Sequence, residues 1–145
     1  MKKISLKLGS GNLGSGYNSV NVELKQDSIT IWEGGTCSLK AAPELKSLLD
    51  EWILFYEAIV RLNTKDSRAI TLSTEPIVRN VSIKDIRDLH DRLKEELNKW
   101  LSKSDFARVE KSLRTKLHAN EEITVSIQSS QKEIWQLPWY LWDFF

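Results

Sequence analysis

The side chains best suited to catalysis are one thiol, Cys37, and two imidazoles, His90 and His118. Nucleophilic catalysis by cysteine needs a thiolate beside a base. Cys37 lies in the turn-like stretch Gly-Gly-Thr-Cys-Ser, whereas both histidines fall on predicted helices. One cysteine and two separated histidines also lack the paired spacings of zinc sites. We therefore predict no catalytic dyad and no metal, and keep a cysteine-dependent enzyme using Cys37 only as an alternative.

A glycine-rich stretch, Gly9-Ser-Gly-Asn-Leu-Gly14, matches the G-x-G-x-x-G pattern of dinucleotide-binding loops. Such a site needs a helix that starts at the third glycine, because the helix N-terminus holds the pyrophosphate. Here the segment from Ser19 to Lys25 has the alternation of a strand, and the companion motifs of protein kinases are absent. We interpret the stretch as a flexible hairpin loop and expect no cofactor.

The charge balance does not indicate a polyanionic partner. The 21 basic and 20 acidic residues alternate along the chain, so they create no field that would attract nucleic acid or an anionic membrane. No apolar run reaches the length needed to cross a bilayer. A single cysteine and a start without a signal peptide predict a cytoplasmic location.

The elements that would position these residues follow from periodicity. Alternating apolar residues predict strands over 4–8 and 20–24, and a third strand from Ser28 to Trp32, which together form an antiparallel meander ended by Gly34-Gly35. A further alternating segment, 122–128, returns the chain to the sheet. A short strand is also predicted over 69–73.

Between these strands the chain is helical. One helix starts at Pro43, a second is capped by Ser82, and a third is capped by Ser104 or Asp105. Strands first, helices next and a final strand predict an α+β fold, with a mixed or antiparallel sheet and about three helices packed on one face. The inward apolar stripes are Leu45, Leu48, Leu49, Trp52, Phe55, Tyr56, Ile59 and Leu62; Ile86, Leu89, Leu93, Leu97, Trp100 and Leu101; and Phe106, Val109, Leu113 and Leu117.

The last part of the chain, 134–145, is unusually rich in aromatic residues. Pro138 ends the strand expected before it, and three of the six tryptophans, Trp135, Trp139 and Trp142, lie on its two sides. These rings could fill the core or form an interface. We expect Ile134 and Leu137 in the core, and Trp142, Phe144 and Phe145 exposed at an interface.

The aromatic segment also resembles a known family. Ile123-Thr-Val-Ser-Ile-Gln128, a short polar turn, and then Leu137-Pro-Trp-Tyr-Leu-Trp-Asp143 are similar to the junction that leads into the CHAT domain of cyanobacterial proteins. Tyr140 stands where we associate a histidine with this pattern. Other resembling pieces are the glycine loop, Ala42-Pro43-Glu44-Leu45, Asn80-Val81-Ser82, Leu97-Asn98-Lys99-Trp100-Leu101 and Ser104-Asp105-Phe106.

The resemblance implies a caspase-like cysteine-peptidase fold for the domain that follows, and a non-catalytic role for this chain. In CHAT proteins the catalytic histidine and cysteine both lie downstream of the Leu-Pro-Trp segment, in that order. Here Cys37 precedes both histidines. No residue of this chain therefore takes either catalytic role.

These observations predict a regulatory or interaction module over 1–133 and a junction over 134–145 into a following CHAT-like domain. The partner would be that domain in cis, or another protein. The alternative is a free-standing interaction protein that dimerises through its aromatic C-terminus. The expected contact residues are Trp139, Tyr140, Trp142, Phe144 and Phe145.

Overall fold

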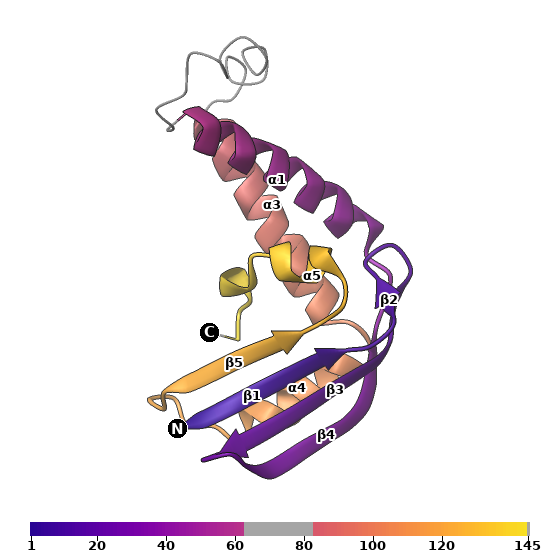
Figure 1. Ribbon diagram of the computed structural model, residues 1–145, viewed down its shortest axis with the longest axis vertical. Coiled ribbons are helices and arrows are strands. Elements are labelled where there is room, and N and C mark those ends of the chain that lie inside the picture. The colour runs from indigo at the N-terminus through magenta and orange to yellow at the C-terminus, as the bar shows by residue number, and fades with distance from the viewer. Residues whose placement is uncertain (63–82, 145) are drawn as a thin grey trace.

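A computed structural model describes residues 1–62 and 83–144 (Figure 1). The strand predicted over 69–73, the helix cap predicted at Ser82 and the contact residue Phe145 lie outside these ranges. The described chain forms one mixed sheet with helices, which confirms the predicted α+β class. Its strands are β1 (Lys2–Leu8), β2 (Gly11–Asn12), β3 (Gly16–Gln26), β4 (Ile29–Leu39) and β5 (Ile123–Gln128).

The predicted meander is confirmed by the pairing of the strands. β1 runs antiparallel to β3 with Leu6 opposite Val22, and β4 runs antiparallel on the other side of β3. β5 returns beside β1 in parallel, with Val125 opposite Ile4. The sheet is therefore mixed, in the order β4, β3, β1, β5, with short β2 paired to the start of β3.

Strand β4 is longer than predicted, since Gly34-Gly35 does not end it. Thr36 pairs with Asn21 and Glu33 pairs with Glu23, so two residues of β4 oppose one residue of β3. This is a β-bulge, and Gly35 has a φ of 70°, which glycine adopts without strain. The strand continues to Leu39, and the predicted turn around the cysteine is wrong.

The helices are α1 (Pro43–Leu62), α3 (Ile83–Leu101), α4 (Ser104–Arg114), α5 (Lys132–Gln136) and the 3-10 turn η1 (Trp139–Leu141). α4 packs on one face of the sheet against β4 and β3, while α1 and α3 form a hairpin that extends away from the sheet (Figure 1). The cap prediction for α4 is wrong, because Lys103 occupies the cap position in an extended conformation without a side-chain cap bond. Residues before Pro138 form α5, not the expected strand.

One hydrophobic core joins all these elements. The inward rows of β1 and β3 meet α4 and the C-terminal half of α3, where Trp100 lies with its ring 6.5 Å from that of Tyr17 and its Nε1 donates to the Lys40 carbonyl at 2.8 Å. Burial of each such side chain stabilises the fold by about 1.5–3 kcal/mol. The largest side chains that are essentially inaccessible are Ile4, Leu6, Leu13, Tyr17, Leu24, Leu45, Leu49, Leu93, Leu97, Leu101, Phe106 and Leu113.

The glycine-rich stretch is a hairpin, as predicted, and its tip is anchored. The Leu13 carbonyl accepts from the Ala42 N–H at 2.6 Å, and the Leu13 N–H donates to Glu133 Oε1 at 2.7 Å. Gly16 has a φ of 92°, and a Cβ there would lie 2.7 Å from the Leu39 carbonyl oxygen. β3 and not a helix follows the glycine-rich stretch, so the stretch lacks the helix N-terminus that a dinucleotide site needs.

Candidate interaction surface

Cys37 is not placed as an activated nucleophile. It is 2% exposed on β4, and its Sγ donates to the Val20 carbonyl at 3.3 Å. Burial raises the pKa of the thiol, and the Asp105 carboxylate adds to this effect while Arg108 opposes it. A raised pKa disfavours the thiolate that catalysis or metal binding requires.

The two histidines lie on other elements and have other partners. The His90 ring on α3 lies 6.0 Å from the Trp52 ring, and its Nδ1 is 3.5 Å from Asp91 Oδ1. His118 follows α4, and its backbone N–H donates to Glu121 Oε2 at 3.1 Å. Within 1–62 and 83–144, no group of three or more His, Cys, Asp or Glu side chains is arranged to hold a metal ion.

The aromatic C-terminal segment is folded into the core. Ile134 and Leu137 are 0% and 4% exposed, which confirms their predicted place. Trp142 is 3% exposed, so the prediction that it is exposed is wrong. The centre of its ring lies 4.8 Å from that of Phe144, on which it stacks, and 5.9 Å from that of Phe106. The C-terminal segment therefore packs against α4.

Asn98 of α3 holds this segment by its backbone. Its Nδ2 donates to the Leu141 carbonyl at 2.9 Å, and its Oδ1 accepts from the Asp143 N–H at 2.8 Å. Phe144 is half-buried, with the Arg114 guanidinium 4.8 Å from the centre of its ring. Residues up to 144 therefore pack with the preceding domain, and the domain boundary at 133/134 stays a prediction.

The turn η1 separates two neighbouring aromatic residues. Trp139 is half-buried and its Nε1 donates to the Ile134 carbonyl at 2.8 Å, so this ring serves the fold. Tyr140 points away and is 66% exposed. Of the predicted contact residues that the structure describes, Tyr140 is thus the one with a largely free surface.

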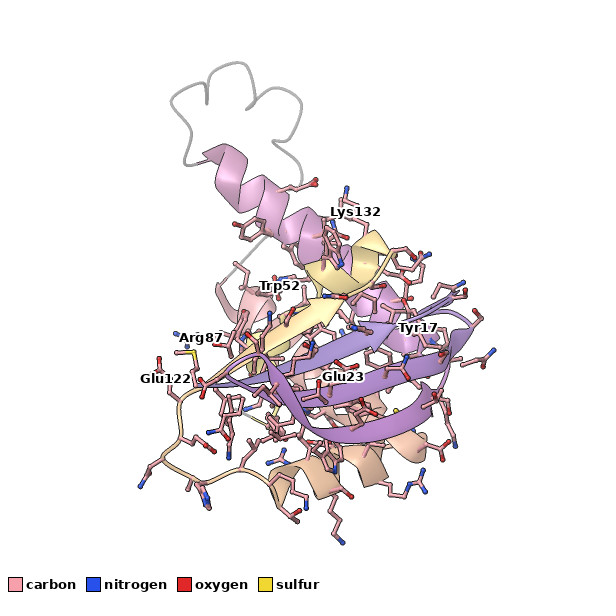
Figure 2. All side chains as sticks on the ribbon, turned by 60° about the horizontal axis from the view of Figure 1, so that its bottom comes forward. Tyr17, Glu23, Trp52, Arg87, Glu122 and Lys132 are labelled. Carbon is pink, nitrogen blue, oxygen red and sulfur yellow. The ribbon has the colours of Figure 1, made fainter. Side chains whose placement is uncertain are left out.

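An apolar groove of about 500 Å³ lies between α1 and the α5–η1 segment; we call it the α1–η1 groove. Tyr56, 62% exposed on α1, and Tyr140 stand at its rim. Half-buried Trp52 (Figure 2) and buried Leu137 contribute apolar surface below them. The lining residues are Trp52, Ile53, Tyr56, Glu57, Gln136, Leu137, Pro138 and Tyr140.

The contribution of α1 to this surface is missed by the sequence pattern. Tyr56 keeps the spacing of the apolar stripe and is predicted to point inward, but it is exposed because this half of α1 extends past the core (Figure 1). Leu45 and Leu49, near the start of the helix, are 0% and 1% exposed. The apolar stripe of α1 is longer than the core can cover, and this excess length is the signal in the sequence that could have identified the groove.

A second depression of about 500 Å³ is lined by Arg114, Leu117, His118, Ala119, Glu121, Ile123 and Phe144. Its charges are engaged within the chain. Lys2 Nζ lies 2.8 Å from Glu121 Oε1, and Arg114 Nη2 lies 2.7 Å from Glu110 Oε1. The hydrogen bond from Lys2, then that from the His118 N–H, lowers the pKa of Glu121. This depression therefore has fewer free recognition groups than the α1–η1 groove.

No protein-family model, curated protein or solved structure matches this chain. The resemblance to CHAT proteins accordingly stays a prediction. None of the helices in the described part of the chain combines the length and the apolar character needed to span a membrane.

Proposed function

We propose that this chain is a protein-interaction module that binds its partner through the α1–η1 groove. The observation that carries this proposal is the pair Tyr56 and Tyr140, 62% and 66% exposed, on either side of an apolar groove. Tyrosine is enriched at interfaces because its ring supplies a large apolar area and its hydroxyl a hydrogen bond. Both rings are carried by helical elements, α1 and η1, so little backbone ordering is needed on binding.

The partner proposed for the groove is a caspase-like domain of the CHAT type, joined after the Leu137–Asp143 segment. The resemblance of that segment supports this choice. Tyr140, where this chain departs from the histidine that we associate with the family pattern, belongs to both the segment and the lining of the groove. A domain joined so close to the groove would bind at a high effective concentration, so a modest interface is sufficient.

The proposed role for this chain is regulatory and non-catalytic. Its only thiol is buried and donates a hydrogen bond to a backbone carbonyl, and burial raises its pKa. These properties favour a structural cysteine. The chemistry, in this proposal, belongs to the joined domain, and the module positions or restrains it.

Oxidative footprinting by hydroxyl radicals tests the proposal. The chain is labelled alone and joined to the proposed following domain, and the labelling of each tyrosine is compared. We expect Tyr56 and Tyr140 to be labelled strongly in the isolated chain and about as weakly as buried Trp142 in the joined protein. Trp135, 69% exposed, lines another depression with Lys7 and Ile127 and serves as the internal reference.

Equal labelling of both tyrosines in the two proteins would refute docking at this groove. Protection that appears in the isolated chain as its concentration rises would instead support self-association. Analytical ultracentrifugation of the same samples separates these outcomes. The dimerisation alternative predicts a mass that increases with concentration.

A further inference from the structure

Strand β5 forms a free edge of the sheet within the described part of the chain. It pairs with β1 on one side only, and Figure 1 shows it as the outermost strand opposite β4. The unpaired N–H and C=O groups of an edge strand are a template for another strand, so most proteins protect such edges.

The opposite edge, β4, shows that kind of protection. Its pairing with β3 is shifted at Gly34–Gly35 and again near Ile31, where Leu24 pairs with Trp32 and Lys25 pairs with Thr30. Bulges twist an edge and interrupt the regular spacing that an added strand needs. β4 is therefore a poor template.

Strand β5 has none of these features. Its six residues, Ile-Thr-Val-Ser-Ile-Gln, contain no proline, glycine or charge, and they pair with β1 from Lys2 to Lys7 without a shift. β-branched residues predominate, and apolar and polar side chains alternate. These properties suit the addition of a strand from another chain.

The apolar face of the sheet is also incomplete at this edge. Ile4 and Leu6 on β1 are 0% and 1% exposed, whereas Ile123, Val125 and Ile127 on β5 are only half-buried. Depressions lie at both ends of the strand, of about 500 Å³ beside Ile123 and about 450 Å³ beside Ile127. The apolar side chains of an added strand would cover Ile123, Val125 and Ile127 and would enter both depressions.

The preference for antiparallel pairing and the charges at the two ends of β5 together indicate which end of the added strand is basic. Glu122, just before β5, is exposed and forms no ion pair with another described residue, and exposed Lys132 lies on α5 beyond the other end (Figure 2). Antiparallel pairing is slightly more stable per residue than parallel pairing. An antiparallel strand with a basic C-terminal end places its positive charge beside Glu122 and away from Lys132.

We propose that β5 binds an extended segment of another protein as an added antiparallel strand. The segment is neutral along its length, alternates apolar with hydroxyl side chains, and ends in Lys or Arg beside Glu122. This proposal is independent of the α1–η1 groove, because the residues that carry it lie on the sheet and at its ends.

The test uses the peptide acetyl-Thr-Val-Thr-Val-Thr-Val-Lys-amide and amide hydrogen exchange followed by NMR. We expect the peptide to slow exchange at the amides of β5 that face the free edge, and to leave the β4 amides unchanged. A control peptide with every second backbone nitrogen methylated has the same side chains but loses strand hydrogen bonds, so its affinity should fall about tenfold or more. Glu122→Lys, an exposed change, should weaken this peptide and favour one ending in Glu.

Three results would overturn the proposal. Unchanged exchange in β5 at saturating peptide would exclude pairing at this edge. Equal affinity of the methylated peptide would show that side chains alone are recognised. Protection of the β5 amides without peptide, rising with protein concentration, would assign the edge to a second copy of this chain.

Discussion

Replacement of Trp142 by alanine tests whether the C-terminal aromatic segment is part of this domain. Trp142 is 3% exposed and its ring contacts those of Phe144, Phe106 and Trp139 at centroid distances of 4.8, 5.9 and 6.1 Å. A buried tryptophan covers about 200 Å², which at about 25 cal/mol per Å² gives an upper estimate of about 5 kcal/mol. Tryptophan-to-alanine changes in cores cost about 3–5 kcal/mol, and we expect a loss in this range.

The assay is urea unfolding followed by far-UV circular dichroism, because the substitution alters tryptophan fluorescence. Tyr140→Ala is the matched control, since Tyr140 is nearby, aromatic and 66% exposed. Its effect should stay within about 0.5 kcal/mol. If Trp142→Ala prevents folding, Trp142→Phe keeps part of the ring contacts and should show an intermediate loss. A loss below about 1 kcal/mol for Trp142→Ala, no larger than that of the control, would refute the core position of Trp142.

Three further substitutions test other parts of the structure by urea unfolding. Gly16→Ala should destabilise the fold by about 1–3 kcal/mol, because the φ of Gly16 is 92° and the new Cβ would lie 2.7 Å from the Leu39 carbonyl oxygen. Gly14→Ala is the control, since a Cβ at Gly14 would contact only the Asn12 side chain. Equal effects of the two substitutions would contradict the packing role of Gly16. Tyr17→Phe should leave stability unchanged or raise it by about 1 kcal/mol, because the buried hydroxyl has no hydrogen-bond partner among described residues. Burial raises the pKa of Tyr17 to about 12, the Glu133 carboxylate adds to this effect, and the Ser129 side chain opposes it. A clear loss in Tyr17→Phe would show that the hydroxyl is satisfied. Glu121→Gln should be less stable than the wild type at neutral pH. The difference in stability should vanish as pH falls below 4.5 and through the folded pKa, because the folded pKa of Glu121 lies below its ordinary value of 4.5. A difference that persists in acid would exclude the ionisation of Glu121 as its cause.

Elements with a strict local period could be predicted from the sequence. The alternation of Ile4, Leu6 and Leu8 and that of Val20, Val22 and Leu24 are each visible within one strand, so the meander follows without knowledge of the fold. The helical stripes are equally local. The return of β5 to the sheet also follows, because its alternation requires a sheet to cover one face.

Features that depend on tertiary contacts could not be predicted in this way. Gly34-Gly35 has the composition of a turn, and only the pairing of β4 with β3 converts it into a bulge. Residues 132–136 are too short for a helical period to be recognised. Whether Trp142 or Tyr140 is buried is decided by the turn at η1 and by the two bonds from Asn98 to the segment.

The candidate site was predicted only in part. Tyr140 belongs to the predicted contact set and is exposed, but Tyr56 comes from a helix and lies 84 residues earlier in the chain. The groove exists because α1 extends past the core and α5 docks beside it. Such a meeting of distant segments has no signature in local periodicity.

The most direct measurement is the affinity between this chain and the proposed following domain, produced as a separate protein, by isothermal titration calorimetry. A Tyr56→Ala, Tyr140→Ala double variant should lose about 2 kcal/mol or more of binding free energy, as expected for interface aromatic residues. Trp135→Ala, also at an exposed aromatic position, should bind like the wild type. Wild-type affinity in the double variant would contradict docking at the α1–η1 groove.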